Sequence, residues 1–267
     1  MATSTSTVQD VLARYSKEQL KELVAVLDPS EQQVVADILD AEERQLAEQV
    51  ALEEQQHIWR LIEKKEPRWD AGPLLWLTQY TKTEDTHALA KNTEFRVPFP
   101  KKSYIQVLFD YFLWEQCKLP HASAALFVLK TREMLFSWCA TAFIAWMCQW
   151  HNAFWIGQSG KQEKGQELIS YAATLYRNQP DWMKAKNPLV LENSMELRWQ
   201  NGGRFMAIPS GVDQARMYHG HGYFQDESSF LPEAEESFNA VRPVVRQVIC
   251  GSTDEIGWFH DECKGEA

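Results

Sequence analysis

The stretch ASAALFVLKTREMLFS, residues 122–137, decides how the chain is expected to fold. Residues 122–129 form a short, mostly apolar run, and residues 134–150 form a longer run without a charged residue. Between the two runs lie Lys130, Thr131, Arg132 and Glu133. A short apolar run, a polar turn and a longer apolar run are typical of a buried strand, a loop and a buried helix. The stretch therefore predicts a strand–loop–helix unit of an α/β domain.

The same alternation continues on both sides of this unit. We expect helices at residues 104–117 and 161–177, a strand at 153–157, and short strands at 222–225 and 244–250. Asn201-Gly202-Gly203 separates residues 196–199 from 204–208, which predicts a hairpin because glycine tolerates the positive φ of a tight turn. Alternating strands and helices predict a mainly parallel central sheet covered on both faces. Ligands bind beyond the C-terminal strand ends of such sheets.

The N-terminal part differs in composition from this core. The formal net charge of the chain is -10. Residues 1–70 contain 8 basic and 15 acidic side chains, so most of the acidic excess lies in this part. Ser16 and Gln19 have the spacing of a capping box, which predicts a first helix that ends near Asp28-Pro29-Ser30. A long, charge-rich amphipathic helix is expected from there to about Lys65. Residues 1–70 thus predict an acidic helical arm, residues 71–103 a linker over the surface, and residues 104–267 the α/β domain.

Two interpretations of the arm stay open. It is either a docking arm for a partner or neighbouring subunit, or a solvated helix packed on the main domain. The acidic balance argues against broad wrapping of nucleic acid, because phosphate affinity comes from clustered Lys and Arg. Any contact with DNA is therefore expected to be local, or to come from another domain.

Cysteine usage and hydropathy place the chain in a cytoplasm. Five cysteines without a C-x-x-C spacing argue against a disulfide framework and a zinc knuckle. The polar start of the chain lacks the features of a secretory signal. Residues 134–150 fall just short of a membrane span, so we expect a buried helix there and no membrane contact.

Polar clusters follow three of the expected strands. The loop from Lys130 to Ser137 has the layout of a phosphate-binding loop, where backbone N–H groups and a helix N-terminus face an anion. Its residues depart from the standard motif G-x-x-x-x-G-K-[ST], because Leu135 and Phe136, not Gly and Lys, precede the hydroxyl residue Ser137. An ordinary capped turn is the alternative.

The second cluster is Asp226-Glu227, and the third is Ser252-Thr253 after the strand-like Val248-Ile249-Cys250. Mg²⁺ on a nucleotide needs a carboxylate, and an adjacent carboxylate can orient or deprotonate the attacking water. A hydroxyl at a core strand end can hydrogen-bond a γ-phosphate. Taken singly, Asp226-Glu227 is weak evidence, because such pairs are commonly solvated loop residues, and Ser252-Thr253 is better explained as a turn. Their order along the chain, each at an expected strand end, is that of phosphate-loop motor ATPases.

The segment from about Trp76 to the C-terminus resembles the ATPase domain of the phage terminase large subunit, the motor that packages DNA into a procapsid. The resemblance is carried by residues 129–138 (LKTREMLFSW), 155–159 (WIGQS), 222–230 (GYFQDESSF) and 248–259 (VICGSTDEIGWF). Together these stretches cover the whole α/β core. The fold that the resemblance implies is a phosphate-loop NTPase with a mainly parallel central sheet.

The resemblance also implies roles for individual residues. Terminases often use a deviant phosphate loop whose catalytic Lys stands at the start of the motif, which corresponds to Lys130. By this likeness Lys130 and Thr131 belong to the nucleotide-binding loop, Arg132 supports the loop or the phosphates, and Ser137 ligates Mg²⁺. Asp226 would hold the metal through water, and Glu227 would be the catalytic carboxylate.

Three further positions complete the implied site. Ser252 and Thr253 would couple hydrolysis to motion, and Arg216 would be an arginine finger that acts on the ATP of a neighbouring subunit. The chain departs from the family at Leu135, where deviant loops usually keep a glycine. Weak turnover is therefore one expectation.

The implied function is a Mg²⁺-dependent ATPase that drives double-stranded DNA into a procapsid, in the cytoplasm of a host cell. The implied partners are double-stranded DNA, a portal protein, the small terminase subunit and further copies in a ring. No nuclease domain is expected within the chain. The alternatives are a helicase-like nucleic-acid ATPase, and a nucleotide-binding module of the packaging complex with little or no turnover. His219-Gly220-His221 is expected to be a structural turn, and most tryptophans are expected in the core.

Overall fold

The computed structural model describes residues 29–84, 94–118 and 124–265. Two compact units are present, Met1–Gln56 and His57–Ala267. The first unit contains most of helix α3 (Pro29–Ile62), the long helix expected from the sequence. Its apolar residues are spread around the helix rather than gathered on one face, so the expectation of an amphipathic helix is wrong. The first helix expected near Ser16 lies outside the described residues.

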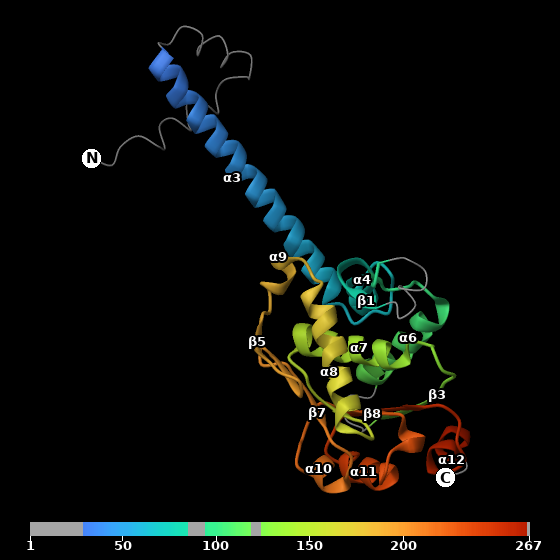
Figure 1. The fold of residues 1–267 in the computed structure, drawn as a ribbon. Helices are drawn as coiled ribbons and strands as arrows, with labels where there is room; N and C mark the ends of the chain where they lie inside the picture. The colour runs from blue at the N-terminus through green and yellow to red at the C-terminus, as the bar shows by residue number, and fades with distance from the viewer. Residues whose placement is uncertain (1–28, 85–93, 119–123, 266–267) are drawn as a thin grey trace. The chain divides into compact units, whose positions relative to one another are not determined.

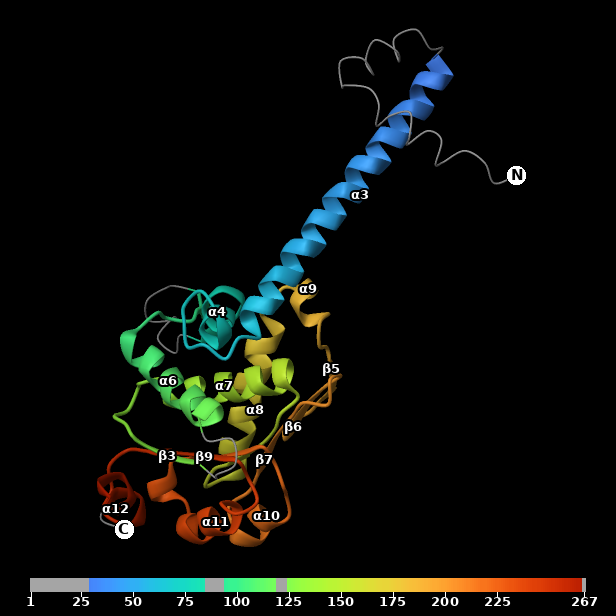
Figure 2. The same ribbon diagram turned by 180° about the vertical axis from the view of Figure 1, so that it is seen from behind.

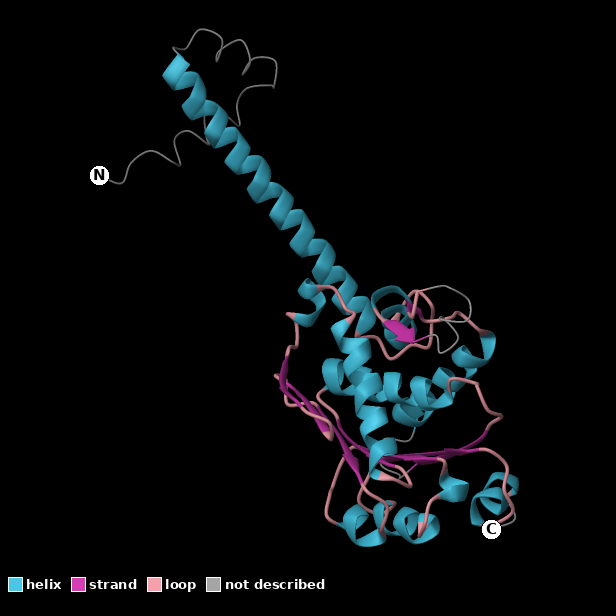
Figure 3. Ribbon diagram, viewed as in Figure 1, coloured by secondary structure: helices cyan, strands magenta, loops and turns pink. Residues whose placement is uncertain are grey.

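The second unit is built on a seven-stranded sheet with the order β3-β9-β8-β4-β7-β6-β5. Figure 3 shows this sheet with helices on both of its sides. The five strands from β3 to β7 in this order are parallel, whereas β6 pairs antiparallel with β7, and β5 pairs antiparallel with β6. The expected α/β fold with a mainly parallel sheet is confirmed. The strands are β3 (Ala124–Leu129), β4 (Phe154–Gln158), β5 (Leu189–Glu192), β6 (Glu196–Trp199), β7 (Arg204–Ile208), β8 (Gly222–Asp226) and β9 (Gln247–Ser252).

Helices cover both faces of this sheet (Figures 1 and 2). Four helices lie on one face and three shorter helices lie on the other, and each set shares a hydrophobic cluster with the strands. The first set is α4 (Gly72–Tyr80), α6 (Ser103–Lys118), α7 (Phe136–His151) and α8 (Gln162–Arg177). The second set is α10 (Val212–Arg216), α11 (Ala234–Val241) and α12 (Trp258–Lys264). The remaining helices of the described part of this unit are α9 (Asp181–Lys184) and the 3-10 turn η1 (Ser228–Phe230).

The strands are apolar on both faces because both faces are covered. In β4, Trp155 belongs to the cluster under α7 and α8, whereas its neighbour Ile156 belongs to the cluster under α11. Phe224 and Tyr223 of β8 divide in the same way. Successive side chains of a strand point to opposite faces, so a continuous apolar run is what a doubly covered strand requires. Each fully buried large side chain contributes about 1.5–3 kcal/mol to folding.

Helix α7 is the buried helix that the uncharged run predicts. Fourteen of its residues are buried, because the sheet, α4, α6 and α8 surround it. Within the described ranges, the structure contains no helix with the length and hydropathy that a membrane span needs. Cys139 and Cys148 are buried, unpaired thiols on this helix, as expected.

The segment expected to be a surface linker contains a buried helix instead. Gly72, at φ 66°, and Pro73 begin α4, and six of its residues are buried. Leu74, Trp76 and Leu77 belong to the main hydrophobic cluster. The expectation of a linker is wrong here, because a Gly-Pro helix start followed by apolar side chains outweighs the Pro, Thr and Lys content of the wider segment.

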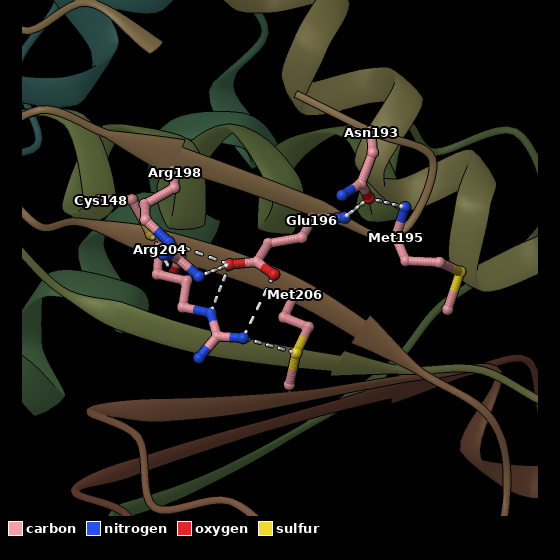
Figure 4. A network of polar contacts seen from close by, with 7 residues as sticks. All are labelled: Cys148, Asn193, Met195, Glu196, Arg198, Arg204 and Met206. Carbon is pink, nitrogen blue, oxygen red and sulfur yellow. Dashed lines mark hydrogen bonds and ion pairs between the residues drawn. The ribbon is translucent and has the colours of Figure 1, made fainter. Parts of the chain in front are cut away.

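The hairpin of β6 and β7 is confirmed, and an ion-pair network fixes its outer side (Figure 4). Glu196 accepts hydrogen bonds from Arg198 and Arg204, each at 2.7 Å. Gly202 has φ 91°, and a Cβ on Gly203 would lie 1.9 Å from the Cys148 carbonyl oxygen. Both turn glycines are therefore needed, one for its backbone conformation and one for close approach to α7.

Candidate active site

The three polar clusters meet at one edge of the sheet. β9 lies between β3 and β8, and Leu129 pairs with Ser252 while Asp226 pairs with Gly251. The C-terminal ends of the three strands are therefore level. The structure thus brings Lys130, Asp226-Glu227 and Ser252 together, although Lys130 and Glu227 are 97 residues apart in the sequence.

Lys130 and Glu227 form an ion pair at this edge. The Lys130 Nζ donates to Glu227 Oε1 at 2.6 Å, with the lysine side chain 10% exposed and the glutamate 41% exposed. Glu227 takes φ 56°, which turns the chain sharply after β8. The Ser252 hydroxyl lies 3.4 Å from Glu227 Oε2, and the Ser252 carbonyl accepts from the Lys130 N–H at 2.9 Å. Ser252 therefore contacts both members of the pair.

Ser137 and Asp226 form the second contact of the site. The Ser137 hydroxyl lies 2.9 and 3.0 Å from the two carboxylate oxygens of Asp226. The pKa of Asp226 is raised from 3.8 to about 6, chiefly by burial; the Ser137 hydrogen bond opposes the rise, and the charge of the nearby Glu227 contributes to it. A buried carboxylate of this kind is stabilised in its charged form by a cation.

This oxygen pair fits Mg²⁺. A serine hydroxyl beside a carboxylate supplies the hard donors that Mg²⁺ prefers, and Mg²⁺ usually takes only one or two protein ligands when substrate phosphates complete its shell. Accordingly, the described residues contain no group of three or more His, Cys, Asp or Glu placed to hold a metal. Ser137 and Asp226 would hold the ion.

The loop before α7 has an unusual backbone. Glu133 and Leu135 have φ 64° and φ 52°, values that favour glycine. Leu135 precedes the first turn of α7 without a side-chain cap, so the first N–H groups of this 16-residue helix have no side-chain acceptor from that position. Such groups suit an anion.

Phe136 holds the start of α7 against β9. Its ring lies over the backbone of Gly251, where an added Cβ would lie 1.9 Å from the ring. Gly251 pairs with Asp226 on one side and with Val128 on the other. The position of Ser137 therefore depends on a close contact with the strand that carries Ser252.

The other predicted site residues are placed less centrally. Arg132 lines a hollow of about 420 Å³ together with Lys130, Glu227 and Thr253, whereas Thr131 is exposed. The Thr253 carbonyl accepts from Ser229 at 3.1 Å. Arg216 lies on α10, and its 64% exposed side chain is 3.7 Å from Asp213 of the same helix. The structure does not bring Arg216 into contact with the site of its own chain.

Sequence reasoning missed a polar row on α8 beside the carboxylates. Lys164 contacts Glu167 at 2.7 Å, and the Tyr171 hydroxyl donates to the same carboxylate at 2.7 Å. The hydrogen bond to Glu167 raises the pKa of Lys164, and the charges of Asp226 and Glu227 add to the rise. The i, i+3 and i+7 spacing of these residues after a strand end was a usable signal.

No family model and no curated protein matches the sequence. Among solved structures, the chain is similar to the large terminase ATPase domain of Thermus phage P74-26 in two crystal structures. In each of the two matches the sequences are 9% identical, and the TM-scores are 0.39 and 0.40. Each match covers 67% of this chain, and the two cover 73% and 72% of the phage domain, respectively.

The chain is also similar to the large terminase of bacteriophage HK97, at 9% identity and a TM-score of 0.43. This match covers 68% of the chain and 37% of the HK97 protein, so the chain spans well under half of that terminase. These structures belong to the family that the sequence motifs resemble. At this identity and these TM-scores the likeness carries no information about activity.

Proposed function

We propose that this chain is a Mg²⁺-dependent ATPase, the motor domain of a viral DNA-packaging terminase that acts in the cytoplasm of a host cell. One observation carries the proposal: Lys130 and Ser137 of one strand–loop–helix unit contact Glu227 and Asp226 at the end of β8, the second strand along the sheet from β3. A lysine, a hydroxyl and two adjacent carboxylates are the groups that phosphoryl transfer from a nucleotide requires.

Each residue has a defined task in this proposal. Lys130 leaves Glu227 for the β- and γ-phosphates, because a triphosphate offers it more negative charge than one carboxylate. Glu227 is then free to orient a water and accept its proton while the water attacks the γ-phosphorus. The bond from the γ-phosphorus to the bridging oxygen breaks, and ADP leaves. Bound Mg²⁺, on Ser137 and Asp226, would neutralise charge on the phosphate oxygens.

Ser252 links this chemistry to motion. Its hydroxyl lies near Glu227, so movement of the Glu227 carboxylate away from Lys130 changes a contact of Ser252. We propose that Ser252 and Thr253 transmit this change to double-stranded DNA. Arg216 acts as the arginine finger on a neighbouring subunit of the assembled ring, which also contacts the portal protein and the small terminase subunit.

The test is steady-state ATP hydrolysis by the full chain with DNA and the partner subunits. Removing the catalytic carboxylate in Glu227→Gln is expected to lower kcat by at least about 100-fold. Lys130→Ala is expected to lower kcat/KM by about 100-fold or more, because it removes a cation from the phosphates. Glu236→Gln and Lys264→Ala change the same side-chain types at exposed positions on α11 and α12 and serve as controls. Equal hydrolysis by wild type and Glu227→Gln would contradict the assignment.

One observation favours a second candidate, a nucleotide-binding module with little turnover. Leu135 stands at positive φ where a loop glycine would let the backbone approach phosphate closely. This candidate predicts nucleotide binding without phosphate release in the same assay. Binding measured together with hydrolysis separates the two functions.

A further inference from the structure

A layer of buried amide and hydroxyl side chains lies behind the carboxylates of the site. Gln158 ends β4 and Gln225 precedes Asp226 on β8; the two glutamines pair in register and are both 0% exposed. Tyr223 belongs to the hydrophobic cluster under α11, and alternate residues of a strand share a face. Gln225 therefore points to the face of α10 and α11, whereas Asp226 points to the face of α7.

Gln158 fixes the loop that leads into α10. Its Nε2 donates to the carbonyl oxygens of Pro209 and Gly211 at 3.0 and 3.2 Å, and its Oε1 accepts from the Tyr223 hydroxyl. Gly211 has φ 121° and directly precedes Val212, the first residue of α10. A buried amide is costly when its hydrogen bonds are not made, so Gln158 confines the loop carbonyls to the positions that it can reach.

The start of α11 holds the same loop from the other side. Glu233 Oε2 accepts from the Val212 N–H at 3.0 Å, and the carbonyl of the next residue, Ala234, accepts from Gln225 Nε2 at 3.1 Å. Helices α10 and α11 lie side by side on this face of the sheet (Figures 1 and 2). The contacts thus close a ring, which runs from β4 through the loop and α11 to β8 and back to β4.

This ring connects Arg216 to the strands of the site without a direct contact. Arg216 stands in the last turn of α10, and its side chain is 64% exposed. The preceding residue, Ala215, is 0% exposed and packs in the cluster under α11. The ion pair of Arg216 with Asp213 lies within the same short helix, and an exposed pair of this kind contributes little. The place from which the guanidinium projects is therefore set by the anchored start of α10.

We propose that Gln158 and Glu233 are positioning residues for Arg216. They hold α10 where its guanidinium can reach the ATP of a neighbouring subunit. This inference rests on the proposed function, and it adds the contacts that orient the arginine. Because Gln225 directly precedes Asp226, the same ring ties the arginine to the strand that carries the carboxylates of its own chain.

The test uses mixed rings, with DNA and the partner subunits present, in which a site and its arginine come from different subunits. Glu227→Gln subunits have an inactive site and an intact arginine, whereas Gln158→Met subunits should have an intact site and a displaced arginine. Alone, Gln158→Met should lower kcat by about 100-fold with little change in KM, because a transition-state group misplaced by about 1 Å costs this much. In an equimolar mixture about a quarter of the interfaces join an intact site to an intact arginine, so hydrolysis should rise at least about 10-fold above either variant alone.

Two controls separate positioning from loss of structure. Arg216→Ala mixed with Glu227→Gln gives the reference for complementation. Gln149→Met breaks a buried amide pair with Gln179 on the other face of the sheet. This variant should lose thermal stability as Gln158→Met does, but keep near-wild-type hydrolysis.

Glu233 tests the same loop at an exposed position, where a substitution does not disturb the core. Glu233→Ala removes the acceptor of the Val212 N–H and should be complemented by Glu227→Gln. Glu233→Gln keeps an oxygen acceptor and should hydrolyse ATP as wild type does. These two variants decide the question if Gln158→Met does not fold.

The outcomes separate this inference from the function on which it rests. If wild type does not hydrolyse ATP, the proposed function fails and this inference fails with it. If Arg216→Ala is not complemented by Glu227→Gln, Arg216 does not act on a neighbour, which also overturns the inference. If Arg216→Ala is complemented but Gln158→Met and Glu233→Ala are not, the proposed function stands and the positioning role is wrong.

Discussion

Gly251→Ala should disturb the candidate site through a single methyl group. The added Cβ would lie 1.9 Å from Cε1 and 2.4 Å from Cζ of Phe136, far inside contact distance. The ring is 3% exposed and packs against Phe224, so it can move only by displacing its neighbours. Overpacking of this kind typically costs about 1–3 kcal/mol, and we expect a loss of that size in the free energy of unfolding.

The same displacement should reach Ser137, which follows Phe136 directly. A shift of the first turn of α7 lengthens the 2.9 Å contact between Ser137 and Asp226, so the affinity for Mg-ATP should fall with stability. Urea unfolding measures the first effect and calorimetric titration measures the second. Gly160→Ala is the matched control, because its Cβ would meet no described atom closer than 3.8 Å.

A double-mutant cycle tests whether the Phe136 ring and a methyl group at position 251 compete for the same space. Phe136→Leu shortens the side chain that the new methyl group meets. The double variant should therefore lose at least about 1 kcal/mol less stability than the sum of the single variants, as expected for residues in direct contact. Strict additivity, or a Gly251→Ala protein as stable as wild type, would show that the ring and the strand do not compete for this space.

Two further substitutions test the backbone and the electrostatics of the site. Glu133 is exposed and has φ 64°, a backbone conformation that glycine adopts without strain, so Glu133→Gly should raise the free energy of unfolding by about 1 kcal/mol in thermal melts. Glu133→Ala keeps the backbone strain and should not raise it. Equal effects of the two substitutions would contradict the presence of strain. In metal-free protein, Asp226→Asn should gain stability relative to wild type as the pH rises from 4 to 7, by about 3 kcal/mol, since the folded-state pKa of about 6 exceeds the unfolded value and ionisation therefore costs wild-type stability. A pH-independent difference in urea unfolding would show that Asp226 is not buried as described.

The parallel core was predictable because its signals are local. Apolar runs bounded by polar turns placed β3, β4, β8 and β9 to within about three residues, and Asn201-Gly202-Gly203 marked the hairpin. Strand ends with polar residues then gave the members of the site. These inferences need only the side-chain period and turn chemistry, which a single sequence contains.

The rest depends on contacts between distant segments or on short elements without a period. Helix α4 was missed because Gly72 and Pro73 lie in a Pro- and Lys-rich segment, and α10 and α12 have only 5 and 7 residues. The sequence placed Lys130 and Glu227 each at an expected strand end but did not indicate that they bind each other. Nor did it indicate that Leu135 would take a positive φ.

The position of β3 has a practical consequence for measuring assembly. β3 is an edge strand of the described sheet, its six residues are uncharged, and Leu129 is 48% exposed. Edges of this kind pair with other chains when nothing blunts them. Self-association of the purified protein through this edge would not depend on the concentration of nucleotide or salt, whereas assembly of the proposed motor ring should depend on both. A dimer or aggregate on a sizing column is therefore no measure of ring formation until a lysine has been placed on β3.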